Sequence, residues 1–290
     1  VDTASGLASN YTVSNPSGLT ASITPKTLTV TGQLVGNKVY DGNTAAQLSG
    51  GTLSGLVGGE SLGLAGQSAE FSDKNAANGK AVTVTGTSLV DTASGLASNY
   101  TVSNPTGLTA SITAKALTVS GQLAGNKVYD GNTQASLSGG TLSGLVGSET
   151  LGIAGQSAVF SDKNAANGKA VTVTGTSLVD TASGLASNYT VSNPTGLTAS
   201  ITAKALTVTG QLAGNKVYDG NTAAQLSGGV LAGLVAGESL GLAGQTATFA
   251  DKNAATAKAV TVTGTTLVDT STGLASNYTV SNPTGLTASI

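Results

Sequence analysis

The sequence contains no cysteine, histidine, methionine or tryptophan, and all of its basic residues are lysine. Without histidine and cysteine it lacks the usual general base, the thiol nucleophile and the common zinc ligands. Most enzyme mechanisms are therefore excluded, and we predict no enzyme activity, no catalytic residues and no cofactor. The absence of cysteine also rules out disulfide bonds, although it does not by itself define a compartment.

Charge is also scarce. Charged residues make up 9 % of the chain and the formal net charge is −2, whereas an average soluble domain is about 25 % charged. The 12 lysines form no basic run, so the phosphate-neutralising patch that nucleic-acid binding requires is missing. No apolar run approaches the roughly 18 residues of a membrane helix, and we expect no membrane insertion in this segment.

The chain does contain one unit written three times, with an offset of 89 residues. Tyr40-Asp41-Gly42 returns as Tyr129-Asp130-Gly131 and as Tyr218-Asp219-Gly220. Tandem copies favour an extended or multivalent protein over an enzyme, because each repeat needs to contact only its neighbours. The predicted domains are residues 24–112 (repeat 1), 113–201 (repeat 2) and 202–290 (repeat 3), after residues 1–23 from the C-terminal part of a preceding repeat.

That leading fragment, together with the absence of an initiator methionine, leads us to expect a window of a longer polypeptide. Each repeat holds one phenylalanine and two tyrosines, so its core must consist mainly of small aliphatic side chains. We therefore expect a repeat to be marginally stable alone and to gain stability from its neighbours.

Apolar side chains alternate with hydroxyls in several short runs, which is the period of a half-buried strand. About eight such strands per repeat predict an all-β, tandem array of small two-layer domains, either immunoglobulin-like sandwiches or β-grasp-like sheets with one short helix. A β-solenoid is disfavoured because no shorter sub-repeat exists. In repeat 1, with one range taken from repeat 2, the expected strands are 38–40, 52–56, 61–64, 68–72, 82–85, 100–102, 108–112 and 117–120.

The segment Asp73–Gly79 resists this interpretation. Its Asn78-Gly79 pair is a strong turn signal, but repeat 3 has Thr256-Ala257 there. A tight primed turn needs positive φ angles, so we favour a helical turn or a long loop over a hairpin turn.

The junction between repeats carries its own signal. The apolar alternation slips by one residue at Ala116-Leu117, and a strand that changes phase changes the face that it buries. We place the domain boundary near Lys115, with the last strand of one repeat running almost directly into the next. Because no flexible linker intervenes, we expect a stiff junction and an elongated rod.

Four carboxylates in each repeat could in principle form a catalytic pair, as in glycoside hydrolysis: Asp41, Glu60, Asp73 and Asp91. Turn and cap roles explain them better. Asp73, Asn75 and Asn78 resemble part of a calcium loop, but the spacing is wrong, no bidentate glutamate follows, and an Asx turn explains the same residues. We predict no metal site.

Burial and surface roles can be assigned at several further positions. Tyr40 and Tyr100 could stack on sugars, but core positions are favoured for so few aromatics. Asn99-Tyr100-Thr101 is a formal glycosylation sequon, although an asparagine opening a strand explains it. The position that reads Glu70, Val159 and Thr248 accepts such different chemistry that its side chain should face solvent.

Several of these motifs, in order and spacing, resemble the YDG-type repeat of large bacterial surface and biofilm adhesins. They are Lys38–Thr44, Phe71–Asn75, Lys80–Val84, Asn99–Val102 and Ala110–Val119. The resemblance covers all three repeats and the leading fragment. It implies a secreted or cell-surface adhesin of the filamentous-haemagglutinin-like, two-partner-secreted class, but it supplies no binding residue.

Two functions follow as hypotheses. The first is a structural stalk or fibre of an extracellular adhesin that mediates cell–cell or matrix attachment in biofilms. The alternative is an array of weak polysaccharide-binding modules that gains affinity by multivalency. The expected partners are extracellular polysaccharide or other copies of the chain, through an exposed strand edge.

Overall fold

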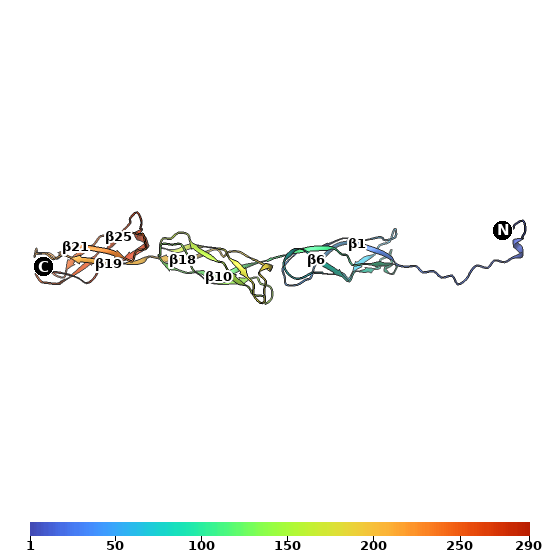
Figure 1. Cartoon of the computed structure of the whole chain (residues 1–290), viewed down its shortest axis with the longest axis horizontal. Helices are drawn as coiled ribbons and strands as arrows, with labels where there is room; N and C mark the ends of the chain where they lie inside the picture. The colour runs from blue at the N-terminus through green and yellow to red at the C-terminus, as the bar shows by residue number, and fades with distance from the viewer. The chain divides into compact units, whose positions relative to one another are not determined.

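The computed structural model describes all 290 residues, which form two compact units, Val1–Thr113 and Ala114–Ile290 (Figure 1). The chain is built almost entirely of β-strands, with four short 3-10 helices and no α-helix. This confirms the predicted all-β tandem array. No helix of the structure is long and apolar enough to cross a membrane.

Each repeat contains nine strands, eight of which recur at equivalent positions in all three copies. Residues before repeat 1 contain only the 3-10 helix η1 (Ala8–Asn10). Repeat 1 comprises β1 (Lys26–Val35), β2 (Lys38–Val39), β3 (Leu48–Ser54), β4 (Gly63–Ala65), β5 (Ser68–Phe71), β6 (Ala77–Thr85), β7 (Ser88–Val90), η2 (Ala97–Asn99), β8 (Tyr100–Val102) and β9 (Leu108–Thr113).

Repeat 2 follows the same plan. Repeat 3 differs at one strand, because β20 (Ala223–Ala224) pairs with β23 (Thr246–Phe249), whereas β2 pairs with β9. Repeat 2 comprises β10 (Lys115–Ala124), β11 (Lys127–Val128), β12 (Leu137–Ser143), β13 (Gly152–Ala154), β14 (Ser157–Phe160), β15 (Ala166–Thr174), β16 (Ser177–Val179), η3 (Ala186–Asn188), β17 (Tyr189–Val191) and β18 (Leu197–Thr202). Repeat 3 comprises β19 (Lys204–Ala213), β20 (Ala223–Ala224), β21 (Leu226–Ala232), β22 (Gly241–Ala243), β23 (Thr246–Phe249), β24 (Lys258–Thr263), β25 (Thr266–Val268), η4 (Ala275–Asn277), β26 (Tyr278–Val280) and β27 (Leu286–Ala288).

Two lobes make up each repeat, and repeat 2 illustrates them. The N-terminal lobe is the sheet β12-β10-β17 with the two-stranded antiparallel sheet β13-β16, and the C-terminal lobe is the sheet β11-β18-β15-β14. Strand β10 is antiparallel to β12 but parallel to β17. Antiparallel and parallel pairs therefore coexist, unlike in an immunoglobulin-like sandwich, whose sheets are antiparallel.

Alternation along the C-terminal strands produces one apolar face, as predicted. Ala158 and Phe160 on β14, and Val171 and Val173 on β15, are buried, while the residues between them are not. The short strand β16 and its equivalents were not expected, because three residues are too few to show a period.

The segment Asp73–Gly79 corrects one expectation. Residues 72–75 form bends and β6 begins at Ala77, so the helical turn is wrong and the loop is correct. A positive φ angle is kept in spite of the substitution, since Gly79 has φ 60° and the equivalent Ala257 has φ 51°. The position lies in a bulge of β6, not in a hairpin turn.

The predicted phase change at the junction is present between repeats 2 and 3, which lie end to end in the second unit (Figure 1). Only Ala203 separates β18 from β19. Ala199 and Ile201 are buried before it, whereas Leu206 is the buried residue after it. The chain therefore turns its apolar side from one lobe to the next within five residues.

Replacing Leu206 by alanine tests whether this strand anchors the junction. Leu206 is 2 % exposed, so Leu206→Ala should lower the free energy of unfolding of the second unit by about 2–5 kcal/mol, measured by urea denaturation. Leu212→Ala, on the same strand but 64 % exposed, is the matched control and should change it by less than about 0.5 kcal/mol. Equal effects of the two substitutions would contradict the assignment.

Candidate functional site

The junction between repeats 2 and 3 holds a single hydrophobic core built from both. The C-terminal lobe of repeat 2 and the N-terminal lobe of repeat 3 contribute buried side chains to the same cluster. Its buried members are Tyr129, Ala158, Phe160, Val171, Val173, Ala199 and Ile201 from repeat 2, and Leu206 and Tyr278 from repeat 3. The packed unit therefore spans the repeat boundary.

Two tyrosines meet at the centre of this junction. Tyr129, which follows β11, is 1 % exposed, and Tyr278, the first residue of β26, is 5 % exposed. Their ring centroids lie 5.3 Å apart with an interplanar angle of 78°. This edge-to-face geometry stabilises aromatic pairs beyond the apolar area that they bury.

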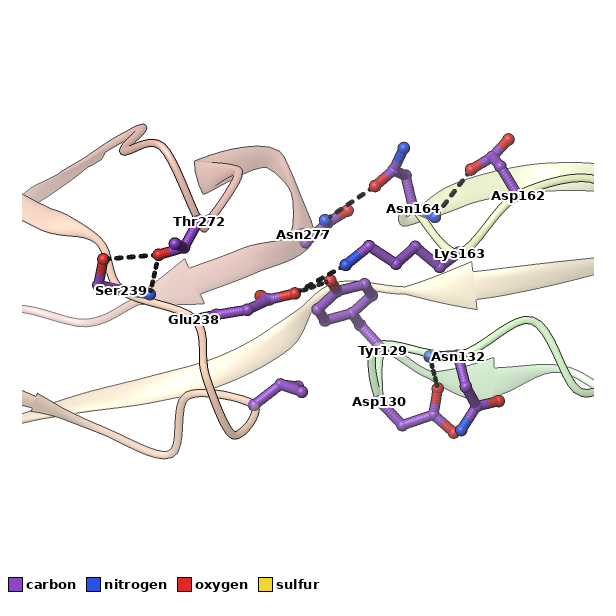
Figure 2. A network of polar contacts seen from close by, with 12 residues as sticks. Tyr129, Asp130, Asn132, Asp162, Lys163, Asn164, Glu238, Ser239, Thr272 and Asn277 are labelled. Atoms are coloured by element: carbon purple, nitrogen blue, oxygen red, sulfur yellow. Dashed lines mark hydrogen bonds and ion pairs between the residues drawn. The ribbon is translucent and has the colours of Figure 1, made fainter.

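Both tyrosine hydroxyls donate to one carboxylate, as Figure 2 shows for Tyr129. Tyr129 Oη lies 2.6 Å from Glu238 Oε1, and Tyr278 Oη lies 2.7 Å from Glu238 Oε2. The ammonium of Lys163 also lies 3.1 Å from Glu238 Oε1. Glu238 is nearly buried, and these three donors replace the water that its charge loses.

A second polar contact crosses the same junction. The amide Nδ2 of Asn277 donates to Asn164 Oδ1 at 3.1 Å, and its Oδ1 accepts from the backbone N–H of Ala165 at 2.8 Å (Figure 2). Asn277 is 1 % exposed and uses both ends of its amide. The contact fixes the orientation of η4 against the bends that follow β14.

Electrostatics favour the charged carboxylate at the centre. Burial alone would raise the pKa of Glu238, but the hydrogen bonds from Tyr129, Tyr278 and Lys163 outweigh it and hold this pKa below its ordinary value. Burial, helped by the hydrogen bond to Glu238, raises the pKa of Tyr278 to about 12. The same two causes raise the pKa of Tyr129. The junction thus keeps glutamate ionised and both tyrosines protonated at neutral pH.

A family model describes the chain in the same three pieces. The YDG domain matches residues 24–107, 113–196 and 202–285. The chain belongs to the YDG domain family. Comparisons with curated proteins and with solved structures give no match.

In this chain, the tripeptide Tyr-Asp-Gly is a junction motif. Tyr129 inserts into the shared core, and Asp130 accepts from the backbone N–H of Asn132 at 3.1 Å. Gly131 has φ 80°, and a Cβ there would lie only 2.8 Å from Val235 Cγ1 of the following YDG domain. Glycine is therefore needed both for its backbone conformation and for the close approach of Val235.

The third copy of the motif provides an internal comparison. Tyr218 is 56 % exposed, against 1 % for Tyr129. The two YDG domains have nearly the same sequence around these residues, but only Tyr129 is covered by another domain of its unit. The following domain therefore completes the burial of Tyr129, and Tyr218 has no such neighbour in its unit.

The predicted carboxylates occupy separate structural positions. Asp41 forms an ion pair with Lys38 at 2.8 Å, and Asp91 accepts from the backbone N–H of Ala97 at 2.6 Å. Glu60 accepts a hydrogen bond from the hydroxyl of Tyr100. None of these contacts joins two carboxylates.

Asp73 has the turn role that its sequence indicated. Its Oδ1 accepts from the backbone N–H of Asn75 at 2.8 Å, which is an Asx turn. The ammonium of Lys80 lies 2.7 Å from Asp73 Oδ2. A lysine therefore already neutralises the carboxylate that a calcium ion would need, and no group of three carboxylates gathers in the structure.

The exposed fractions of the side chains decide two of the remaining sequence predictions. Tyr40 and Tyr100 are 2 % and 6 % exposed, which confirms the core interpretation over sugar stacking. The position of Glu70, Val159 and Thr248 is exposed, as predicted.

Sequence reasoning missed the roles of Glu238, Lys163 and Asn277. Glu238 is the repeat 3 counterpart of Glu60, which had been considered only as a catalytic carboxylate. Asn277, the repeat 3 counterpart of Asn99, does directly precede a strand, but its side chain also crosses the junction. The only available signal was that each residue recurs every 89 positions, which holds for nearly all residues of these copies.

Tyr129→Phe should weaken the junction selectively. The substitution leaves the ring in place but removes one donor to a nearly buried carboxylate, at a cost of about 1.5–3 kcal/mol. Tyr218→Phe is the matched control, because Tyr218 is exposed, and it should be nearly neutral. Urea denaturation of both variants, followed by circular dichroism, measures the difference. Equal stability of the two variants would refute the role of the hydroxyl.

Acid should loosen the junction through Glu238. Because its folded pKa lies below the ordinary 4.5, its contribution is fully present above pH 4.5 and is lost as pH falls through the folded pKa. Melting temperatures of the native chain and of Glu238→Gln, recorded between pH 7 and pH 3, should differ most at pH 7 and converge at low pH. A constant difference would show that Glu238 does not titrate in the junction.

Proposed function

We propose that these YDG domains are stalk or fibre repeats of a bacterial extracellular adhesin, with no enzyme activity of their own, that support cell–cell or matrix attachment in biofilms. The observation that supports this proposal is the shared core between repeats 2 and 3. A stalk must resist bending and separation at every junction, and a junction that buries side chains from both domains does so.

Three features of the junction suit a stalk. The single residue Ala203 between β18 and β19 leaves little freedom for the domains to reorient. Tyr129 and Tyr278 pack against each other across the boundary. The contacts of Glu238 and Asn277 add directional hydrogen bonds, which restrict rotation about the long axis.

The extracellular location is part of the same proposal. It is supported by the membership in the YDG domain family and by the resemblance of the sequence motifs to bacterial surface adhesins. The low charge and the absence of cysteine are compatible with export.

Distances between spin labels on the two sides of the junction test directly whether the junction is stiff. Because the chain has no cysteine, Ser157→Cys and Ser227→Cys introduce one exposed label site on each side of the junction. Pulsed electron paramagnetic resonance should give one narrow distribution of the distance between the two spin labels. Adding Tyr129→Ala and Glu238→Ala should broaden it severalfold, whereas adding Tyr218→Ala should leave it narrow. A broad distribution in the parent chain would refute the stalk.

Deleting one complete repeat tests the role in attachment. Removing residues 113–201 rejoins Ile112 to Thr202 and restores the sequence found at Ile201-Thr202. In a bacterial strain that exports the chain, the deletion should shorten the stalk and reduce surface attachment while export continues. Unchanged attachment after both the deletion and the junction substitutions would argue against the proposed role.

A further inference from the structure

The same surface groove is present in every repeat, away from the junction. In repeat 2 it has a volume of about 450 Å³, and its equivalents in repeats 1 and 3 have about 390 and 300 Å³. These volumes are in the range of sites that hold small molecules or segments of a polymer. In repeat 2 the lining comes from two segments, residues 118–122 and residues 192–197.

The groove exists because a strand pairing stops early. Strand β17 pairs with β10 only along Lys115–Leu117, after which residues 192–197 diverge from β10. On its other side, β10 stays paired with β12 as far as Ala124. Residues 118–122 therefore have a strand neighbour on one side only, and polar backbone groups of β10 face the groove.

Its lining is neutral and rich in hydrogen-bonding groups. Threonine, serine, asparagine and glutamine line it in all three repeats, and no charged or aromatic residue takes part. Asn193 Oδ1 accepts from the backbone N–H of Thr176 at 2.9 Å, which leaves both hydrogens of Nδ2 without a partner in the chain. Val119 and Leu197 add a small apolar floor. This chemistry suits an uncharged ligand with many hydroxyl groups.

An added peptide strand is the competing ligand, because an open sheet edge is a template for strand addition. The backbone of β10 argues against it. Gly121 has φ 67°, in the middle of the open segment, and Gly32 and Gly210 have φ 65° and 68° at the equivalent positions. A left-handed residue interrupts the regular spacing of backbone donors and acceptors that a peptide strand would need.

We infer that each groove binds a segment of a neutral polysaccharide. The groove offers hydroxyls, amide groups and open backbone groups to the sugar hydroxyls, and its lack of charge disfavours polyanions. Hydrogen bonds of this kind are individually weak in water, so one groove should bind weakly. Three equivalent grooves in one chain should bind a long polysaccharide more tightly through multivalency. The inference goes beyond the stalk, which needs no ligand.

Blocking the grooves one at a time in the full chain tests this inference. Asparagine tolerates positive φ, and a Cβ added at Gly32, Gly121 or Gly210 meets no atom within 4 Å. Gly121→Asn therefore adds a side chain at the groove without displacing its neighbours. The control places asparagine at Gly79, Gly168 and Ala257, which also have positive φ but lie in the C-terminal lobe, in the bulges of β6 and β15 or just before β24.

Affinity electrophoresis of the full chain in dextran and in galactomannan gives the readout, with alginate as the polyanion and an alternating Thr-Val octapeptide as the strand probe. A neutral polysaccharide should retard the native chain and the control. One blocked groove should weaken binding a fewfold, and three should weaken it at least tenfold, with unchanged circular dichroism.

A second set of variants changes the groove without altering its backbone, so that a folding defect of the asparagine variants would not decide the test. Thr29→Val, Thr118→Val and Thr207→Val together remove one hydroxyl from each groove, and none of these hydroxyls bonds within the chain. They should also weaken retardation. The inference is overturned if neither neutral polysaccharide retards the native chain, if blocking leaves retardation unchanged, or if only alginate or the peptide binds. None of these outcomes affects the label distances that test the stalk.

Discussion

Burial of the motif tyrosine by the following domain is the contact on which the junction depends. Tyr129 lies in its own repeat, but Tyr278, Glu238 and Val235 of the next repeat cover it. Its copy Tyr218 is largely exposed. A tyrosine suits this position because its ring fills the shared core while its hydroxyl reaches the carboxylate at the edge. Asp130 and Gly131 then shape the turn that presents the ring.

This contact makes the packing unit different from the sequence repeat. A repeat of 89 residues is divided into two lobes, and the core at the junction combines the second lobe of repeat 2 with the first lobe of repeat 3. Small side chains fill these lobes, so neither has a large core of its own. Sharing a core between neighbours is the physical reason for which we expect tandem copies to be more stable than single ones.

The neutral composition has a second consequence away from the junction. With few charges and many hydroxyls, the surface grooves beside β10 can offer only hydrogen bonds and small apolar contacts. Such a surface offers no positive charge to a polyanion and binds weakly at each point. Repetition compensates for weak binding just as it does for a small core, so the same tandem arrangement serves both the proposed stalk and the inferred polysaccharide grooves.

The sequence by itself determined the all-β class, the period of 89 residues, most strands and the change of phase near Ala116, because these are local patterns with a fixed spacing. It also correctly placed Tyr40 in the core and the position of Glu70 in solvent. Only the tertiary structure decided that Glu238 joins Tyr129 and Lys163, residues that lie 75 or more positions away. It likewise decided that the pairing of β17 stops at Leu117 and leaves a groove. Contacts between distant segments depend on how strands pair and lobes pack, which no local pattern records.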